Sequence, residues 1–273
     1  MSQQLAMPEP HTDRRIFLAR VVRTAPVTPH MVRITLAGED LTRYEDVGPD
    51  QFLYVFLPGP NGGPPRVGHD FTWEGWRDLP PEERPVGRYY TVRYCRPERG
   101  ELDLDFVLHG DGPATAWAVQ AKSGDAVALW GPRFAYTPPA ATDFLLLLAD
   151  ETGLPATAAI LESLAPGIRA HACIEVRDRS AEQPLPSEGA ARITWLHRGD
   201  RTPGDALLHA VRTLDLLPRG VTAYVWGGAE FNAMMACRAY LVEERGLAGA
   251  CIRTVGYWRH DQARANGDAG GSR

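Results

Sequence analysis

The sequence is poor in lysine and has no excess of positive charge. Lys122 is the only lysine among 29 basic residues, and the 273-residue chain has a formal net charge of −5. Proteins that bind nucleic acid rely on cations that contact phosphates, so a negative chain is a poor candidate for that role. We therefore expect no nucleic-acid partner. The preference for arginine over lysine by itself indicates no function.

Cysteine is also scarce, and its spacing argues against two kinds of site. The four cysteines, Cys95, Cys173, Cys237 and Cys251, lie far apart and form no C-x-x-C pair. Zinc and iron–sulfur centres usually need such a pair, and a disulfide framework needs a denser set in a small chain. We expect reduced thiols in the core and no metal site made of protein ligands.

Long apolar runs are missing as well. The longest, from Phe144 to Ala149, has six residues, whereas a helix that crosses a bilayer needs about 20. The first 15 residues are polar, contain proline and lack the apolar segment of a signal peptide. We expect a cytoplasmic protein that does not associate with membranes.

The pattern that is present divides the chain into two parts, as its length allows. Short alternating segments between Arg15 and about Tyr136 predict a small six-stranded antiparallel barrel with one helix. Pro26 and Pro29 are expected in the turn between the first two strands. The expected strands cover residues 16–23, 31–36, 52–57, 88–93, 101–108 and 126–130, and the expected helix covers 114–121.

After Pro138, strands alternate with helices, which predicts a doubly wound parallel sheet. The expected strands are 144–149, 170–176, 192–196, 222–226 and 251–257, with helices at 154–164, 203–214 and 230–245. We place the first domain at residues 14–138 and the second at 139–260. The segments 1–13 and 261–273 are expected to be disordered tails.

Between residues 58 and 85 the sequence predicts a long structureless loop rich in proline and glycine. Trp73 and Trp76 within it suggest that the loop packs on another part of the protein. Loops of this length are usually functional or disordered. An insertion held by a local hydrophobic anchor is the other interpretation.

The most informative motif is R-x-Y-T-x-R at residues 88–93. Tyr90 offers a flat ring for stacking on an isoalloxazine, and Thr91 offers a hydroxyl and an N–H near the redox nitrogen. Arg88 and Arg93 offer paired donors to a pyrophosphate. Strand alternation places Arg88 and Tyr90 on one face, and Thr91 and Arg93 on the other. Read alone, the segment is better explained as an ordinary strand, because Tyr, Thr and Val favour strands and arginines often flank them.

Three further motifs lie where strands give way to turns. The first, H-G-D-G-P-A at residues 109–114, leads into a helix whose free N–H groups suit a flavin pyrophosphate, although the same letters also form a plain turn. The second, A-D-E-T-G at 149–153, follows the first parallel strand, where α/β sheets bind nucleotides. Thr152 and the Gly153 N–H are the expected donors there. Alternatively, Asp150 and Thr152 only cap the next helix.

The third of these motifs is W-G-G-A-E at residues 226–230, read as a turn after a later strand. Paired glycines permit close approach of a nicotinamide, and Glu230 suits the positive end of the next helix. A turn that merely joins strand to helix explains the motif equally well. The second motif, at residues 149–153, is not the G-x-G-x-x-G fingerprint of dinucleotide-binding proteins, so its phosphate contact is expected to be looser.

As a set, in this order, the motifs resemble those of the siderophore-interacting proteins, which are flavin-dependent ferric-siderophore reductases of the ferredoxin-reductase superfamily. The resemblance covers roughly residues 15–260. It includes the W-x-x-W-R-x-L-P segment that begins at Trp73 and the closing residues 256–259, G-Y-W-R. It implies a six-stranded FAD-binding barrel followed by a doubly wound NAD(P)H-binding domain.

The resemblance also implies roles for individual residues. Those implied to hold FAD are Arg88, Tyr90, Thr91 and Arg93, with His109, Gly110, Pro113, Ala114 and Trp117 around its phosphates and ribose. Those implied to border the nicotinamide nucleotide are Asp150, Glu151, Thr152, Gly227, Gly228 and Glu230, and Tyr257 and Trp258 are expected to cover the flavin or the dinucleotide.

The substrate site implied by the resemblance departs from the family pattern. Relatives often carry a lysine in the strand that matches residues 52–57, where it attracts an anionic ferric siderophore, and this chain has Tyr54 near that place. Arg259 matches the basic residue that often ends the family pattern. We expect Tyr54 and Arg259 to contact the substrate. The class of siderophore stays open.

The leading hypothesis is therefore an oxidoreductase that passes electrons from NADPH or NADH through FAD to the Fe(III) of a siderophore, which releases Fe(II). The cofactor carries the chemistry, and no side chain is needed as nucleophile or acid. One alternative is a general flavin reductase or diaphorase with a quinone or ferredoxin partner. Another is a non-catalytic redox sensor that binds flavin and siderophore.

The choice of nucleotide is also open from the sequence, and so is ferredoxin as donor. Near the end of the second parallel strand, Glu175 could bind a ribose 2′-hydroxyl, whereas Arg177 or Arg179 could bind a 2′-phosphate.

Overall fold

A closed barrel forms the first part of the chain in the computed structural model, which describes residues 14–59, 62–110, 112–218 and 220–260. Its six strands pair in the order β1-β2-β5-β4-β3-β6, and every pairing is antiparallel. The predicted barrel is confirmed. Its strands are β1 (Arg15–Thr28), β2 (Met31–Ala37), β3 (Phe52–Phe56), β4 (Gly87–Arg96), β5 (Glu101–Val107) and β6 (Ala126–Arg133), and α2 (Pro113–Gln120) is its predicted helix. The predicted tails lie outside the described residues.

The position expected for Pro26 is wrong, because this residue lies inside β1 opposite Val32. The pairing of β1 with β6 stops at Arg20, so the later part of β1 pairs only with β2. A proline is tolerated on such an edge because its missing N–H would have pointed away from the sheet. The turn itself is confined to Pro29 and His30.

The segment 58–85 is not the structureless loop that the sequence predicts. It contains α1 (Trp73–Asp78), where the Thr72 hydroxyl accepts from the Gly75 N–H, followed by a short 3-10 turn (Pro81–Glu83). Trp73 packs edge-on against Tyr54 on β3 and Trp130 on β6, with ring centroids 5.1 and 5.3 Å apart. The predicted packing of the tryptophans is confirmed, and burial of these rings on the barrel wall gives the segment its order.

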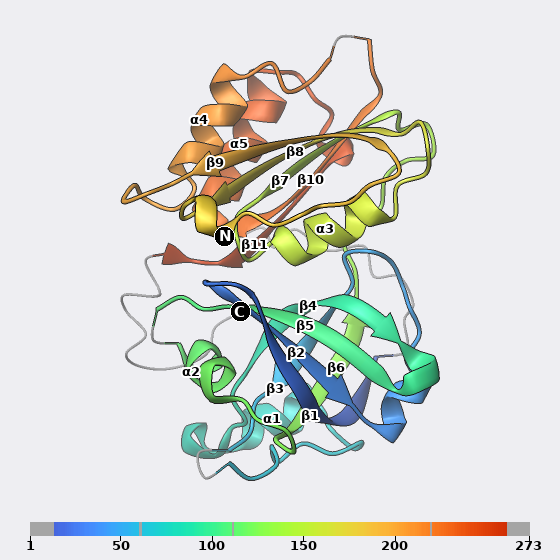
Figure 1. Ribbon diagram of the computed structural model, residues 1–273, viewed down its shortest axis with the longest axis vertical. Coiled ribbons are helices and arrows are strands. Elements are labelled where there is room, and N and C mark those ends of the chain that lie inside the picture. Colours follow the sequence, from blue (N-terminus) through green and yellow to red (C-terminus); the bar gives the residue numbers. More distant parts are fainter. Residues whose placement is uncertain (1–13, 60–61, 111, 219, 261–273) are drawn as a thin grey trace.

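The second part of the chain is a five-stranded parallel sheet in the order β11-β10-β7-β8-β9. Helix α3 lies on the barrel side of this sheet, and α4 and α5 lie on the other side (Figure 1). The predicted doubly wound fold is confirmed. Its strands are β7 (Phe144–Ala149), β8 (Arg169–Val176), β9 (Ala190–His197), β10 (Ala223–Glu230) and β11 (Ile252–Trp258), and its helices are α3 (Leu154–Glu162), α4 (Asp205–Thr213) and α5 (Phe231–Glu243).

The turn predicted at the paired glycines is wrong, because β10 continues through Gly227 and Gly228 to Glu230. Glycine is needed at these two positions because neighbouring side chains pack directly against the strand. A Cβ on Gly227 would lie 2.8 Å from the Met234 sulfur, and one on Gly228 would lie 3.0 Å from the Tyr257 ring. Because glycine has no side chain, these neighbours occupy the space that a Cβ would otherwise take.

The two domains share a buried boundary. Val27 and Met31, from the β1–β2 hairpin, pack into the same apolar cluster as Leu145 and Leu161 of the second domain. The connection between β6 and β7 runs through Pro138, where we placed the end of the first domain. In the part of the chain that the structure describes, no helix is long and apolar enough to cross a membrane.

Candidate flavin and nucleotide site

Strand β4 brings the R-x-Y-T-x-R motif to the domain boundary. Tyr90 is partly buried and packs against the barrel core, where its ring is tilted by 32° to that of Phe106, with 4.0 Å between centroids. Burial raises the pKa of Tyr90, while nearby Arg88 opposes the rise. Alternation turns Thr91 and Arg93 outward, toward the second domain. One side of the Tyr90 ring is thus already covered by protein.

Among the unpaired buried polar atoms of the described residues, the Thr91 hydroxyl is the one that lies in the R-x-Y-T-x-R motif. This hydroxyl is buried, yet it has no hydrogen-bond partner in the segments that the structure describes. The Thr91 side chain is near enough to Tyr257 to lower the pKa of that phenol, which burial raises, but no bond of ordinary geometry joins them. A buried unpaired hydroxyl is costly and usually marks a group that a ligand or water satisfies. A flavin edge with polar ring atoms fits this position, so these residues suit FAD.

The two arginines of the motif differ in what they contact. Arg88 is exposed and donates to the Gly87 carbonyl at 2.7 Å. Arg93 is buried, and its two terminal nitrogens donate to the two carboxylate oxygens of Glu162 on α3, at 2.8 and 2.5 Å. The pyrophosphate contact expected for each arginine stays a prediction, and for Arg93 it competes with this ion pair.

The H-G-D-G-P motif connects β5, which ends at Val107, to helix α2. Helix α2 starts at Pro113 after Gly112, which has no side-chain cap, so the first N–H groups of the helix stay available to an anion. Gly110 takes a positive φ of 58°, which allows a tight turn before the helix. Ala114 and Trp117, however, belong to the barrel core, so Ala114 could reach a phosphate only through its N–H. The phosphate role of the motif stays a prediction.

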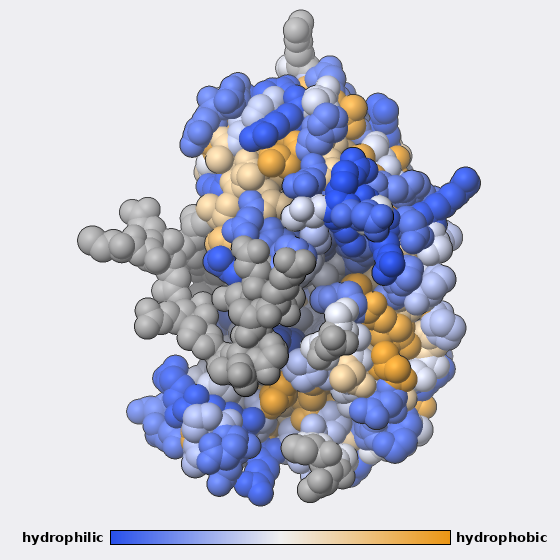
Figure 2. Space-filling model, turned by 90° about the vertical axis from the view of Figure 1, so that its left-hand side faces the viewer, coloured by the Kyte–Doolittle hydropathy of each residue, from blue (hydrophilic) through white to orange (hydrophobic). Residues whose placement is uncertain are grey.

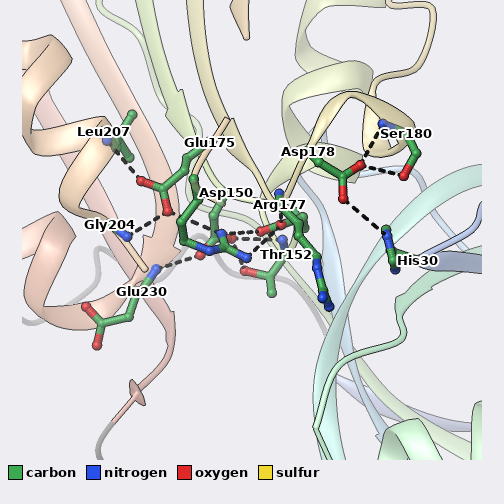
Figure 3. Close-up of polar contacts among 12 residues, drawn as sticks. His30, Asp150, Thr152, Glu175, Arg177, Asp178, Ser180, Gly204, Leu207 and Glu230 are labelled. Atoms are coloured by element: carbon green, nitrogen blue, oxygen red, sulfur yellow. Dashed lines mark hydrogen bonds and ion pairs between the residues drawn. The ribbon is translucent and has the colours of Figure 1, made fainter. Parts of the chain in front are cut away.

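Asp150 connects three elements at the carboxyl end of the parallel sheet (Figure 3). One carboxylate oxygen accepts from the Thr152 N–H and hydroxyl at 2.8 and 2.6 Å. The other accepts from the Glu230 N–H at 2.9 Å and the Trp258 indole at 2.7 Å. The donors expected for the nucleotide, Thr152 and the Gly153 N–H, therefore bond to Asp150 instead. A nucleotide contact by Thr152 stays a prediction.

The stability of the protein should depend on pH through Asp150. Full burial raises the pKa of Asp150 to about 6, with repulsion from Glu151 adding to the rise and its hydrogen bonds opposing it. Because the folded state then holds the proton more tightly than the unfolded state, this group stabilises the protein at low pH, and the gain is lost as pH rises from about 4 to 6.

The variant Asp150→Asn removes this titration. We expect the unfolding free energy of the wild type, relative to Asp150→Asn, to fall by about 2 kcal/mol as pH rises from about 4 to 6, and by less than about 0.5 kcal/mol above pH 6. Urea titrations at pH 4, 5, 6 and 7 measure the difference. A difference that grows with pH would contradict the assignment.

An ion-pair network ties the ends of β7, β8 and β9 together. Arg198 donates to Glu151 at 3.0 and 3.1 Å and to Glu175 at 3.2 Å. Glu175 is fully buried and also accepts from the Gly204 and Leu207 N–H groups at the start of α4, at 2.7 and 3.0 Å. The possibility that Glu175 binds a ribose hydroxyl is therefore wrong, because both of its oxygens are used inside the protein.

The last predicted site residues converge on the same edge. Glu230 caps α5 by accepting from the Ala233 N–H at 2.9 Å, as its position at the helix start predicts. The Trp258 ring lies 5.6 Å from that of His109, which comes from the barrel, so two motifs far apart in sequence meet across the boundary. Partial desolvation lowers the pKa of His109, against the opposing effect of Glu151. Contacts of these residues with a nucleotide stay predictions.

The two expected substrate residues lie in different domains. Tyr54 is enclosed by the rings of Phe56, Trp73 and Tyr89, at 4.9 to 5.1 Å between centroids. A Cβ on Gly87 would collide with the Tyr54 ring, so only glycine leaves room for that ring. Arg259 follows β11, and its guanidinium lies 3.6 Å from the centroid of the Phe231 ring. A shared ligand for Tyr54 and Arg259 stays a prediction.

Sequence reasoning missed the polar groups that join the domains. The buried Asp50 carboxylate, before β3, accepts from the Ala135 N–H at 3.1 Å and from the Trp226 indole on β10 at 3.0 Å. Burial raises the pKa of Asp50, and these donors oppose the rise. Glu162 and Arg198 were missed too. Only for Arg198 was there a signal, since it follows a parallel strand at the sheet edge where ligands bind.

A barrel followed by a parallel sheet of this kind is the architecture of ferredoxin-reductase-like proteins. A crystal structure of ferredoxin NADP⁺ reductase from Neisseria gonorrhoeae, with bound FAD and NADP, matches with a TM-score of 0.64 over 89% of this chain and 99% of that one, at 14% identity. At that identity the match shows the fold alone.

Two family models then cover both domains, the siderophore-interacting FAD-binding domain at residues 20–136 and the siderophore-interacting protein at residues 142–261. The chain belongs to the siderophore-interacting protein family, as its motifs predict.

Several relatives are similar over most of the chain. Ferric vibriobactin reductase of Vibrio cholerae is 32% identical over 87% of each chain, and an NADPH-dependent ferric-chelate reductase of Escherichia coli is 34% identical over 67% of this chain and 72% of that one. The crystal structure of a siderophore utilization protein from T. fusca matches at 35% identity with a TM-score of 0.80, over 91% and 94% of the two chains.

Proposed function

We propose that the protein is an FAD-dependent reductase of ferric siderophores that takes its electrons from NADPH. The observation that carries the proposal is the unpaired, buried Thr91 hydroxyl on β4, at the boundary where the barrel meets the carboxyl end of the parallel sheet. The named functions of the relatives from Vibrio cholerae and Escherichia coli support the substrate and the donor. The cytoplasmic location stays a prediction.

When bound, FAD supplies the exchange between a two-electron donor and a one-electron acceptor such as Fe(III). The chain's own residues would bind and orient the flavin and the nucleotide. Tyr90 and Thr91 would hold the flavin ring, and the free N–H groups at the start of α2 would hold its phosphates. Asp150 keeps the turn after β7 closed, so the nucleotide would meet a preformed edge. The ferric siderophore is substrate, and Arg259 offers it a cation.

An anaerobic visible spectrum of the purified protein tests the proposal. We expect flavin absorption bands that bleach on addition of NADPH and return when a ferric siderophore is added, with Fe(II) captured by a chelator. Bleaching without reoxidation would favour a general reductase with another acceptor, such as a quinone. A protein that binds no flavin would overturn the proposal.

The charges at the end of β8 support NADPH as the proposed donor. Glu175, which could have repelled a 2′-phosphate, is buried and paired, whereas Arg177 and Arg179 are exposed. Arg177 uses its N–H to bond to Glu151, and its side chain extends away from the Asp150 network (Figure 3). The two exposed guanidinium groups therefore suit an added phosphate. Figure 2 shows strongly hydrophilic side chains on the upper lobe next to the domain boundary, coloured by hydropathy and not by charge.

Replacing Arg177 with alanine should therefore weaken NADPH selectively. We expect the Kd for NADPH to rise about tenfold, which corresponds to the loss of one charge-assisted hydrogen bond. The Kd for NADH should change less than twofold. Equilibrium titration with each nucleotide measures both constants, and Arg169→Ala, an exposed arginine at the opposite end of β8, is the matched control. Equal losses for both nucleotides would contradict 2′-phosphate binding.

A further inference from the structure

We propose that Arg93 and Glu162 form a positioning pair that holds the flavin strand at a fixed distance from the nucleotide turn. The inference rests on the proposed function, because it concerns how the two ligand-binding parts are held together. It differs from the role implied by the family resemblance, in which Arg93 contacts FAD itself.

The contact has the geometry of a rigid link. Arg93 is 6% exposed, and its fork meets both oxygens of Glu162 in a bidentate ion pair. The guanidinium also lies 4.1 Å from the centroid of the Tyr94 ring, which holds it from a second side. A planar guanidinium held in this way has little freedom to rotate, and the burial of Arg93 strengthens the attraction even though the Glu162 side chain is 27% exposed.

Each partner of the pair lies close in sequence to one half of the candidate site. Arg93 lies two residues from Thr91 on β4, where the register with β5 shifts between Val92 and Tyr94, and both side chains are buried. Glu162 is the last residue of α3, and α3 begins at Leu154, immediately after the turn that Asp150 holds closed. A helix of nine residues is about 13 Å long, and most of its side chains are buried between the sheet and the barrel (Figure 1).

The helix therefore links the flavin strand to the nucleotide turn. Its N-terminal end is fixed to the nucleotide turn by Asp150 and its C-terminal end to the flavin strand by Arg93. Transfer between two bound rings requires their reacting atoms to be about 3–3.5 Å apart, and an error of 1 Å can cost about a hundredfold in rate. Loss of the pair should leave each ligand bound and slow only the step that needs both.

Glu162→Gln tests the proposal, because it removes the charge while keeping the shape. We expect FAD content and the Kd for NADP⁺ to stay within twofold of the wild type, while flavin bleaching by NADPH in stopped-flow slows about 10- to 100-fold. Arg93→Lys, which keeps the charge but loses the fork, should behave in the same way. Glu243→Gln, at the exposed last residue of α5, is the matched control and should change none of these values.

Two outcomes would overturn the proposal. One is a Glu162→Gln protein that bleaches at the wild-type rate. The other is loss of FAD from Arg93→Lys but not from Glu162→Gln, which would make Arg93 a ligand of FAD.

A second readout does not depend on activity. Hydrogen exchange of the flavin-free protein should become faster in α3 and β4 of Glu162→Gln, and not of Glu243→Gln. Unchanged exchange in Glu162→Gln would contradict the positioning pair, whether or not NADPH reduces the protein. If NADPH fails to reduce the wild type but exchange does become faster in Glu162→Gln, only the proposed function is contradicted.

Discussion

Replacement of Gly153 by alanine is expected to destabilise the protein more than any other single methyl group added at the site. The Cβ of an alanine there would collide with the carbonyl oxygen of Gly228 on β10 and lie 2.8 Å from its carbonyl carbon. Both contacts are with backbone, so no side chain can rotate away. The turn after β7 or the strand β10 must therefore move.

The cost of this movement is about 3 kcal/mol, at the upper end of the range for overpacking. For a chain of this size that corresponds to a fall in Tm of roughly 6–12 °C, measured by differential scanning calorimetry. The φ of Gly153 is −87°, which alanine also adopts, so the effect is one of space and not of backbone preference.

Gly63→Ala is the matched control, because a Cβ there would meet nothing within 4 Å. We expect its Tm to change by less than about 2 °C. The affinity for NADP⁺ should fall in Gly153→Ala and not in Gly63→Ala, since the displaced turn is the one that borders the proposed nucleotide site. A Gly153→Ala protein with the wild-type Tm would show that the turn and β10 do not pack as closely as the structure has them.

The same contact shows where sequence reasoning reaches its limit. The run from Phe144 to Ala149 predicts a buried parallel strand, and β7 has those bounds, because six apolar residues in succession need cover on both faces of a sheet. The glycines at 227 and 228 predict a turn, yet they lie inside a strand. Local sequence cannot distinguish a glycine that bends the chain from one that makes room for a neighbour such as Tyr257.

The motifs of the candidate site could be predicted from the sequence, but the contacts that join one motif to another could not. The end of β7 could be located, and the motifs on β4 and β10 could be found, because each carries its own pattern of residues, although both of these strands run further than predicted. The partner of Arg93 could not, since Glu162 lies 69 residues away and resembles any acidic residue at a helix end. The burial of Glu175 was equally hidden, because it depends on α4 beginning beside β8. Pairings between distant segments are set by the packing of domains, which no local pattern records.

Thr91→Val should raise the stability of the flavin-free protein and lower its affinity for flavin. The Thr91 hydroxyl is buried and unpaired in the described part of the chain, so it costs free energy that valine, of similar shape, does not. We expect the flavin-free variant to gain about 1 kcal/mol, or roughly 2–4 °C in Tm. In the proposed complex the hydroxyl bonds to the flavin, so the variant should bind FAD about 10- to 100-fold more weakly.

Thr157→Val is the control that separates these two effects. The Thr157 hydroxyl on α3 is also buried and unpaired within the described segments, but it is not part of the flavin motif. Its removal should raise the Tm by a similar amount and leave the affinity for FAD unchanged. Fluorescence titration of the flavin-free proteins with FAD measures the affinities. If both variants gain stability and both keep the wild-type affinity, the Thr91 hydroxyl has no flavin partner, and the observation that carries the proposed function loses its force.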